Sequence, residues 1–249
     1  MFLLDIKNDT LHVWVAELSE YRDQYQHFFS LLDSDERILA KRIVNVSVQQ
    51  MFVLSHGWLR IVLGEYLGYP ADQLVIAKAS HGKPFLVDSP QLVFNLTHCL
   101  DKMLLAVAWD CQLGVDIEIC QARAGLEDIA KICLADEELA HWSALSDQHK
   151  TTVFYQFWTR KEAFFKATGL GIGAGLQECI INPNQPDSFL KLPVQYGTLV
   201  DWHIINLDLW PDVSTVVVAD KRFPVVGYPY KCEKIYLRHG LETRVKYAA

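Results

Sequence analysis

The chain has 249 residues, 51% of them hydrophobic and 21% charged, and its formal net charge is −7 at pH 7. The hydrophobic fraction is ample for a buried core and excludes a disordered chain. The negative net charge argues against a general nucleic-acid-binding protein, because such proteins normally have a basic surface, so we expect no nucleic-acid partner.

Targeting and cysteine patterns favour a cytoplasmic protein. The sequence contains no run of eighteen apolar residues, so we expect no membrane span. Residues 1–7 do not have the basic region and long apolar segment of a secretion signal. The six cysteines include no Cys-x-x-Cys pair, which argues against a zinc-finger site and favours reduced core residues. They are Cys99, Cys111, Cys120, Cys133, Cys179 and Cys232.

A strand and two helices are predicted at the start of the chain. Residues 11–18 alternate enough between apolar and polar side chains to predict a strand. A charged helix follows, and Asp33 or Ser34 can cap its N-terminus. Residues 48–66 have the apolar pattern of a long buried helix, which the Gly-Tyr-Pro sequence at 68–70 would end.

The middle of the chain predicts short strands whose connections are too short for parallel crossovers, so we expect antiparallel hairpins. Helical patterns return at 125–144 and 150–168. Strands separated by Pro and Asn turns are expected over 178–220, where 215–219 is the clearest. The strands expected in the middle are 74–79, 93–97, 103–109 and 113–119.

The order of these elements predicts an α+β fold of two similar lobes, because strands and helices recur in both halves of the chain. We expect an N-terminal lobe of residues 1–112 and a C-terminal lobe of residues 113–249. No Ser- or Pro-rich linker marks the boundary, so the lobes should pack closely.

Two carboxylates lie two residues apart in the strand predicted at 113–119. Asp116 and Glu118 point to one face of that strand, while Val115 and Ile117 point to the other. Neighbouring carboxylates repel each other and are costly to desolvate, and a bound cation would remove both costs. The alternative is a solvent-facing polar edge with an apolar back, and the strand alone leaves it open.

Trp158, Glu162 and Lys166 follow at successive i+4 positions, so they share one face of the helix predicted at 150–168. Aromatic residues surround them in the sequence, so we expect Glu162 and Lys166 near a buried interface. The alternative is a simple Glu–Lys helix salt bridge. That alternative accounts for one pair, but not for the aromatic surroundings or the strand carboxylates.

Two polar segments precede these motifs. Gly82-Lys83-Pro84 predicts a turn that holds the lysine on a rigid corner, suited to a phosphate or a ring edge. Thr97 and His98 offer a hydroxyl and an imidazole at a strand end. Each alone is an ordinary turn or a surface histidine, but their order together with the other two motifs is specific.

The four segments together resemble the Sfp-type 4′-phosphopantetheinyl transferases. The pattern of that family runs Gly-Lys-Pro, Phe-Asn-x-Ser-His, Gly-(Val/Ile)-Asp-x-Glu and Trp-x-x-Lys-Glu-Ala-x-x-Lys. The matching segments here are 82–84, 94–98, 114–118 and 158–166, with Thr97 in place of the usual serine.

The resemblance implies transfer of the phosphopantetheine arm of coenzyme A to a serine of an apo acyl or peptidyl carrier protein, with adenosine 3′,5′-bisphosphate as the other product. It also implies two lobes related by a pseudo-two-fold axis, each with an antiparallel sheet and helices. Both lobes are present in one chain, so we expect a monomer. Carrier proteins are commonly acidic, so their docking surface should be apolar or locally basic.

Site residues carry over by motif position. The resemblance implies that Asp116, Glu118 and Glu162 hold Mg²⁺, or Mn²⁺ in its place, which fits the preference of Mg²⁺ for a few carboxylates and substrate phosphate oxygens. Glu162 would deprotonate the serine and Lys166 would neutralise phosphate charge, so the expected catalytic residues are Glu162, Lys166 and Asp116. The residues expected to hold the coenzyme are Lys83, Pro84, Thr97, His98 and Lys166.

The chain departs from the family in the long N-terminal helix, where many members have an arginine and this sequence has Met51-Phe52. Nearby basic residues are candidates to bind the nucleotide instead, and Arg37 and Arg60 are included among the expected coenzyme contacts. A solvated helix face explains each of them equally well. The candidates are Arg37, Lys41, Arg42 and Arg60.

Two further segments have ordinary interpretations. The glycine-rich run 169–175 follows a helix, whereas a phosphate-binding loop precedes one, so we expect it to end the helix and form a turn. The segment from Lys231 onward carries five basic and two acidic residues. A solvated tail is the favoured interpretation, and a partner-binding patch is the alternative.

Two other classes of function use the same residues. A hydrolase would use the carboxylates and a metal to cleave a phosphoester with water. A catalytically silent binding module would keep Glu162 and Lys166 only as a structural pair. The resemblance favours the group transferase.

Overall fold

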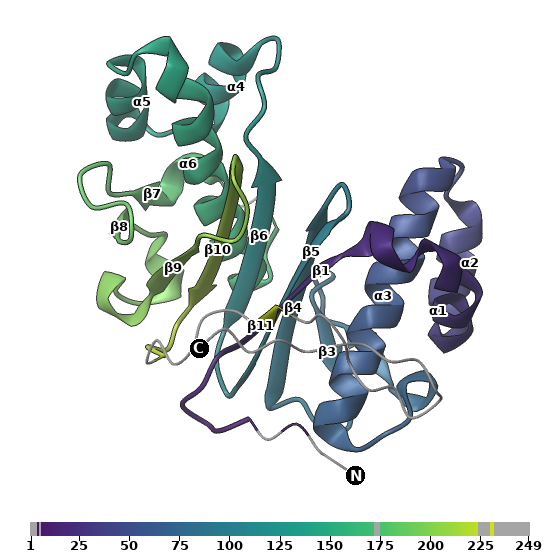
Figure 1. The fold of residues 1–249 in the computed structure, drawn as a ribbon. Coiled ribbons are helices and arrows are strands. Elements are labelled where there is room, and N and C mark those ends of the chain that lie inside the picture. The colour runs from purple at the N-terminus through teal and green to yellow at the C-terminus, as the bar shows by residue number, and fades with distance from the viewer. Residues whose placement is uncertain (1–3, 5, 172–174, 224–229, 232–249) are drawn as a thin grey trace.

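The computed structural model describes residues 4, 6–171, 175–223 and 230–231 of the chain. Figure 1 shows two halves side by side, each with a sheet and a long helix packed against it. The fold is α+β, as the sequence predicts. Strands within the described residues pair antiparallel, except that β11 (Tyr230–Lys231) runs parallel to β1 (His12–Glu17).

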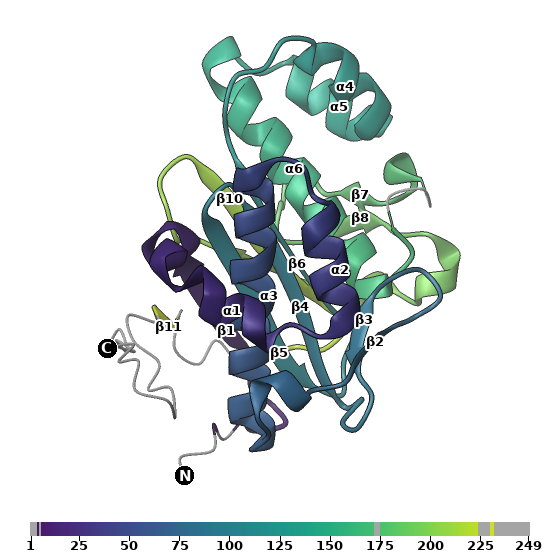
Figure 2. The same ribbon diagram turned by 90° about the vertical axis from the view of Figure 1, so that its right-hand side faces the viewer.

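The N-terminal half is a sheet covered by helices. Its elements after β1 are a 3-10 helix (Leu18–Gln24), α1 (Tyr25–Leu31), α2 (Ser34–Arg42), α3 (Val46–Leu67), a 3-10 turn (Ala71–Gln73), β2 (Ile76–Lys78), β3 (Pro84–Leu86), β4 (Leu92–Cys99) and β5 (Lys102–Trp109). The sheet order is β11-β1-β5-β4, and β2 and β3 form a separate hairpin. Figure 2 shows α3 lying across this half, with α1 and α2 on either side of it.

Local signals set the helix boundaries of this half. The Asp33 side chain accepts a hydrogen bond from the Glu36 amide, and the Glu36 carboxylate accepts one from the Asp33 amide, so the two residues cap α2 reciprocally. Asn45 caps α3 by accepting from the Val48 amide. Gly68 ends α3 in the left-handed conformation, with φ 69°. The predicted strand and both predicted helices of this region are confirmed.

The C-terminal half repeats this plan. Its elements are β6 (Leu113–Ile119), α4 (Leu126–Cys133), α5 (Asp136–Ser143), α6 (Asp147–Thr168), β7 (Ile180–Ile181), β8 (Phe189–Lys191), β9 (His203–Leu207) and β10 (Val213–Ala219), with 3-10 helices at Leu176–Glu178, Val194–Tyr196 and Leu199–Asp201. The sheet order is β6-β10-β9, and β7 pairs with β8. The helix α6 packs on β6 and β10, and it has 22 residues, as α3 has.

One predicted hairpin is wrong. The strands β4 and β5 pair antiparallel as expected, but β5 and β6 belong to different sheets, and β6 pairs with β10. Asp110, between β5 and β6, has a left-handed backbone with φ 49°. Further along, the Val115 amide of β6 donates to the side chain of Asn95 in β4 at 2.8 Å. A side-chain acceptor therefore stands where a continuous sheet would have a backbone carbonyl.

The helical pattern at 125–144 forms two helices rather than one. Leu134 has an extended backbone between α4 and α5. The Glu138 carboxylate accepts a hydrogen bond from the Ala135 amide at 2.9 Å, which starts α5. The sequence does not predict β3, because three residues are too few to establish a period of two.

The two halves share a hydrophobic contact between their sheets. Leu104 of β5, Val115 of β6 and Val217 of β10 are fully buried in this shared cluster. Each half also has a core of its own, around Trp58 in the first and Phe164 in the second. The halves therefore pack closely, and the helices α3 and α6 cover them on opposite sides (Figure 1).

Two predicted segments fall partly or wholly outside the described residues. The basic tail lies there from residue 232 onward, as do residues 172–174 of the glycine run. Gly169 ends α6 with φ 75°, as predicted. Each helix in the described ranges is too short or too polar to cross a lipid bilayer.

Candidate active site

The candidate site lies where α6 faces β6, beside β4. The helix carries Glu162 and Lys166 one turn apart, and the strand carries Asp116 and Glu118. Thr97 of β4 completes this group, since its hydroxyl contacts both Lys166 and Asp116. The fold therefore brings together three segments, 94–98, 114–118 and 158–166, that lie far apart in the sequence.

Lys166 links the three elements. Its Nζ lies 2.6 Å from Asp116 Oδ1 and donates to Thr97 Oγ1 at 3.1 Å. Asp116 is only 4% exposed, whereas the Lys166 side chain is 31% exposed. Burial raises the pKa of Asp116, and the charge of Lys166 opposes that rise. Thr97 keeps a hydroxyl at this position, so the exchange of serine for threonine preserves the contact.

Glu162 is a buried carboxyl close to these groups. It is 7% exposed, and its Oε1 has no hydrogen-bond partner among the described residues. Burial, followed by the charge of Asp116, raises the pKa of Glu162 to about 7, although Lys166 acts in the opposite direction. A carboxyl that titrates near neutrality can accept a proton at physiological pH and release it again.

Glu118 is half-buried at the outer end of β6. Burial and the charge of Asp116 raise its pKa, while hydrogen bonds from Cys99 and Trp158 lower it. The Sγ of Cys99 lies 3.7 Å from Glu118 Oε2. Trp158 and Glu162 thus both face β6, on the shared helix face that their i+4 spacing predicts.

The chemistry of these carboxylates fits a divalent metal. Asp116 Oδ2 and Glu162 Oε1 are buried oxygens with no hydrogen-bond partner within the described part of the chain. Buried polar atoms are normally satisfied, so two such oxygens in one site call for a ligand. Among the described residues no three His, Cys, Asp or Glu side chains converge on a common metal position. Lys166 pairs with the other oxygen of Asp116, so the fit rests on the two unsatisfied oxygens.

Lys83 connects the two halves near the end of α6. Its Nζ donates to the carbonyl oxygens of Ala167, at 2.6 Å, and Leu113, at 3.0 Å. Burial lowers the pKa of Lys83 to about 8. The predicted turn exists between β2 and β3, with Pro84 as the first residue of β3. Its lysine binds one backbone carbonyl at the C-terminus of α6 and one at the start of β6. A carbonyl at a helix C-terminus attracts a cation, which explains the position.

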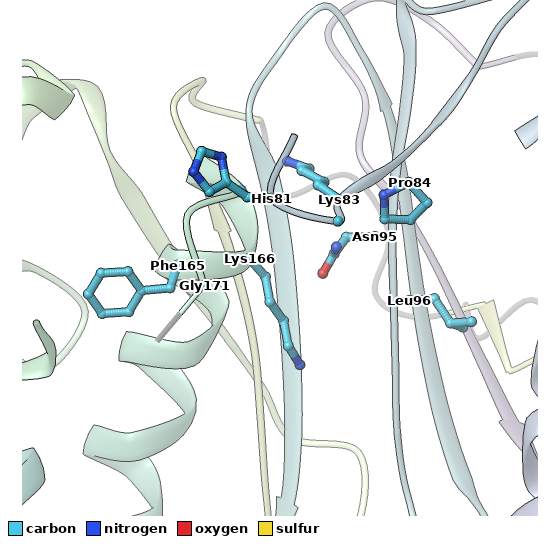
Figure 3. A pocket seen from close by; sticks show the side chains of 10 residues that line it. His81, Lys83, Pro84, Asn95, Leu96, Phe165, Lys166 and Gly171 are labelled. Carbon is cyan, nitrogen blue, oxygen red and sulfur yellow. The ribbon is translucent and has the colours of Figure 1, made fainter. Parts of the chain in front are cut away.

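A cavity of about 210 Å³ lies between the halves, and Figure 3 shows the side chains that line it. It is lined by Lys83 and Pro84 from one side and by Lys166 from α6, which extends along β6. Asn95 points into the same space from β4, whereas Phe165 points away from it into the C-terminal core. Three of the expected coenzyme contacts, Lys83, Pro84 and Lys166, therefore border one cavity.

Asn95 is a site residue that side-chain chemistry alone does not reveal. It is 5% exposed, and its Oδ1 accepts the hydrogen bond from the Val115 amide. This bond fixes β6 against β4, directly beside Asp116. The signal for it in the sequence is its place in the Phe-Asn-x-Thr-His segment, since no periodic pattern predicts a contact between these strands.

His98 is exposed near the end of β4. Loss of surrounding water lowers its pKa, and the nearby charges of His56 and Lys166 lower it further. His56 lies on α3, where its Nδ1 is 2.8 Å from Glu36 Oε1. The sequence does not single out His56, because only the fold brings α3 opposite β4.

Arg60 does not reach the candidate site. Its side chain is fully buried, its Nε donates to Glu36 at 2.6 Å, and it also pairs with Asp33 and with backbone carbonyls after α3. These partners engage the guanidinium inside the N-terminal half. The structure therefore does not support the prediction that Arg60 contacts the coenzyme. Its ion pairs with Asp33 and Glu36 hold the N-terminus of α2 against α3.

The other positions near the missing arginine have local roles. Met51 is 8% exposed and belongs to the core of the N-terminal half. The guanidinium of Arg37 donates to the Ser30 carbonyl at 2.8 Å. Met51 thus packs in the core at the position where many family members have an arginine. The hydrogen bond to Ser30 holds Arg37 against the segment that precedes α2.

Lys161, the first lysine of the segment 158–166, points into the C-terminal half. Its Nζ lies 2.5 Å from Glu138 Oε2, and both side chains are 0% exposed. It also donates to the carbonyls of Cys133, at 3.0 Å, and Leu176, at 2.8 Å. Lys161 therefore holds α4, α5 and the segment after α6 against the helix that carries Glu162.

Residues 112–219 match the family model described as the 4′-phosphopantetheinyl transferase superfamily. The chain is 34% identical over 224 residues to the 4′-phosphopantetheinyl transferase HetI of Nostoc sp. (strain PCC 7120 / SAG 25.82 / UTEX 2576). This alignment covers 87% of this chain and 90% of HetI. It is 30% identical over 130 residues to the L-aminoadipate-semialdehyde dehydrogenase-phosphopantetheinyl transferase of Xenopus laevis, covering 48% and 43%. A crystal structure of a holo-(acyl-carrier-protein) synthase from Bacillus anthracis str. Ames in complex with CoA (3′,5′-ADP) aligns at a TM-score of 0.33 with 17% identity, covering 40% of this chain and 93% of that one.

Proposed function

The chain belongs to the 4′-phosphopantetheinyl transferase superfamily, and on this premise we propose that it transfers the 4′-phosphopantetheine group of coenzyme A to a serine of an apo acyl or peptidyl carrier protein. As a 4′-phosphopantetheinyl transferase, the protein is an enzyme that activates carrier proteins. We propose further that the reaction depends on Mg²⁺ and releases adenosine 3′,5′-bisphosphate.

One observation carries the proposal most directly. Lys166 and Asp116 form a close pair beside Glu162, a buried carboxyl whose Oε1 has no hydrogen-bond partner in the described part of the chain. All three residues lie in the range that matches the family model. Phosphoryl-type transfer uses a cation to neutralise phosphate charge, a carboxylate and a base. Lys166, Asp116 and Glu162 supply these three groups in one partly open site.

We propose that Asp116, Glu118 and Glu162 hold the metal, although the three carboxylates do not converge on one position among the described residues. Asp116 and Glu162 each have one buried oxygen without a partner among the described residues, which supports this proposal. Mg²⁺, or Mn²⁺ in its place, would supply positive charge that stabilises the negative charge of the pyrophosphate when bound.

The side chains of the chain itself account for the proton and the charge. Glu162 accepts the proton of the serine hydroxyl, since its buried carboxyl lies beside Lys166 and Asp116. The serine oxygen then bonds to the phosphorus that carries the pantetheine arm, and the bond from that phosphorus to the bridging oxygen breaks. The electron pair leaves with adenosine 3′,5′-bisphosphate. Lys166, which Asp116 and Thr97 hold in place, neutralises charge on the phosphate under attack.

The coenzyme contacts remain proposals. Pro84 borders the cavity between the halves, and the Thr97 hydroxyl contacts Lys166. These two residues and His98 are proposed to hold the nucleotide and its phosphates. We also propose Lys83 as a coenzyme contact. Its Nζ also donates to the Ala167 carbonyl at the end of α6. Arg37, in the N-terminal half, is also proposed to contact the coenzyme.

We propose that the enzyme acts as a monomer in the cytoplasm, with lobes 1–112 and 113–249. The change of sheet between β5 and β6 supports a boundary at this point of the chain. Each lobe contributes residues to the site, which supports a single chain as the complete unit.

Incubation with coenzyme A, Mg²⁺ and an apo acyl carrier protein tests the function. We expect intact-protein mass spectrometry to show a gain of one phosphopantetheine on the carrier. Loss of coenzyme A with an unmodified carrier would favour a hydrolase instead. A folded protein that changes neither the coenzyme nor any member of a panel of carriers would favour a silent binding module.

A further inference from the structure

An exposed apolar surface lies where α2 meets α3. Residues 38–48, here called the α2–α3 corner, contain five large hydrophobic side chains with high exposure. They are Ile38 (49% exposed), Leu39 (43%), Val44 (95%), Val46 (66%) and Val48 (52%).

Single exposed apolar side chains are common and need no explanation, but a group of five within eleven residues is unusual for a surface that stays in water. The helices at the corner are set by their caps and by the buried faces of α2 and α3, so the core does not require these side chains. Such a cluster indicates a surface that is covered in the working state of the protein.

The corner is also locally basic. Residues 37–64 contain no Asp or Glu, although the chain as a whole has a net charge of −7. Lys41 and Arg42 are exposed in the last turn of α2, where the helix dipole alone would favour them. The Lys41 ammonium lies 5.9 Å from the centroid of the Phe29 ring, so it extends toward α1. Positive charge beside an apolar group fits a partner with an acidic and partly apolar face.

A line of side chains connects the corner to the candidate site. Val48, Phe52 and His56 are spaced four residues apart, so they share one face of α3. The rings of Phe52 and His56 are 4.0 Å apart between centroids. His56 in turn lies close enough to His98 to affect its charge, and His98 is similarly coupled to Lys166. At a rise of about 1.5 Å per residue, Val48 is about 12 Å along the helix from His56.

We propose that the α2–α3 corner is the docking surface for the apo carrier protein, with Val44, Val46 and Val48 packing on an apolar strip of the carrier and Lys41 and Arg42 pairing with its acidic residues. This inference rests on the proposed function. A carrier seated there presents its serine from the α3 side of the site, facing Glu162 across the space between the halves.

A second exposed apolar group lies at the opposite edge of the molecule and does not fit as well. It begins in β8, which Figure 1 shows far from α2 and α3. Residues 187–201 carry two aspartates, Asp187 and Asp201, and one lysine, Lys191, so the group lacks the net positive charge that an acidic partner requires. Its exposed members are Leu190 (43%), Val194 (95%), Leu199 (41%) and Val200 (79%). This group supplies matched controls.

The test compares steady-state kinetics of paired variants with coenzyme A, Mg²⁺ and an apo acyl carrier protein. Val44→Glu with Val46→Glu should raise the KM for the carrier at least tenfold and leave the KM for coenzyme A unchanged. Val194→Glu with Val200→Glu changes two equally hydrophobic exposed positions and should leave both KM values unchanged. Circular dichroism confirms that each variant is folded.

A second pair isolates charge. Lys41→Glu should raise the KM for the carrier several-fold at low salt, with a smaller effect at high salt, because exposed charges are screened. Lys191→Glu, an exposed lysine next to the control group, should change neither value.

The outcomes separate this inference from the function on which it rests. A wild-type protein that modifies no carrier overturns the proposed function and this surface with it. A wild-type protein that modifies the carrier, with unchanged carrier KM in the corner variants, overturns only the surface. Gel filtration that shows a dimer broken by Val44→Glu would also overturn it, because the corner would then be covered by a second copy of the chain.

Discussion

A Cβ atom added to Gly114 would lie 2.0 Å from the carbonyl oxygen of Ala163 and 2.4 Å from the amide nitrogen of Ala167. The backbones of β6 and α6 are therefore in direct contact, which a residue with a side chain would prevent. This contact sits between the two motifs of the site. It brings Lys166, one residue before Ala167, within 2.6 Å of Asp116, two residues after Gly114.

Changing Gly114 to Ala should therefore displace α6 from β6. Overpacking of this kind costs about 1–3 kcal/mol or more, because the clash is with backbone atoms that cannot rotate away. We expect urea unfolding to show this loss, and we expect the transfer rate to fall more than the stability alone explains, since the Lys166–Asp116 pair would be separated.

Gly125→Ala is the matched control for that change. Gly125 has φ 74°, and no atom of the described residues lies within 4 Å of an added Cβ, so the variant isolates backbone strain. We expect a cost of about 1 kcal/mol and an unchanged transfer rate. A Gly114→Ala protein with normal stability and rate would show that the close contact between β6 and α6 is absent.

Asp116→Ala should weaken the binding of coenzyme A in the presence of Mg²⁺ far more than in its absence. The change removes the carboxylate that we assign to the metal, together with the partner of Lys166. Isothermal calorimetry with and without Mg²⁺ measures both affinities. Asp128→Ala, at an 81% exposed side chain, serves as control. Equal affinity of wild type and Asp116→Ala under both conditions would mean that the metal site is wrong.

The contribution of Lys83 to stability should depend on pH. Burial lowers its pKa in the folded protein to about 8, below the ordinary lysine value of 10.5. Between these two values the unfolded chain binds a proton that the folded chain has lost, so folding becomes more favourable as the pH rises. The neutral amine still has two N–H donors for the carbonyls of Ala167 and Leu113.

We therefore expect the stability of wild type relative to Lys83→Met to increase between pH 8 and pH 10, as measured by urea unfolding at each pH. Taking the difference between the two proteins cancels the titration of other groups. A difference that stays constant over this range, or that falls, would contradict the lowered pKa.

The buried pair of Lys161 and Glu138 should show strong coupling. Lys161→Met leaves a carboxylate unpaired at 0% exposure and should cost about 3–5 kcal/mol of unfolding free energy. Adding Glu138→Gln should recover part of that loss, because the remaining group is neutral. A double-mutant cycle measures the coupling.

The exposed pair of Lys131 and Asp128 is the control, with side chains 63% and 81% exposed. Exposed pairs contribute roughly 0–1 kcal/mol, so the same cycle on Lys131→Met and Asp128→Asn should give a coupling near zero. Equal coupling in the two cycles would refute the structural role assigned to Lys161.

The parts of the fold that short-range signals determine could be predicted from the sequence. Asp33 and Gly68 mark the ends of helices through bonds to residues three to five positions away, and such signals are visible in a window of the sequence. The break between β5 and β6 could not be predicted, because it depends on the Asn95 side chain binding the Val115 amide twenty residues away.

The candidate site follows the same division. Asp116, Glu162 and Lys166 could be identified from spacing and motif, since each lies in a regular element whose facing side is fixed by its period. The positions of Lys83 and Arg60 could not, because a basic side chain in a turn or on a helix gives no indication of its partner. The structure attaches one to the end of α6 and the other to the cap of α2.

The central claim is that Glu162 is the base and a metal ligand of a phosphopantetheinyl transferase. The most direct measurement is the single-turnover rate of phosphopantetheine transfer to an apo acyl carrier protein by Glu162→Gln, followed by mass spectrometry with saturating coenzyme A and Mg²⁺. Glu137→Gln, the same change at an exposed position of α5, is the control and should match wild type. We predict a rate for Glu162→Gln that is about 10²- to 10⁴-fold lower, with normal folding. A folded Glu162→Gln protein that transfers at the wild-type rate would contradict the claim.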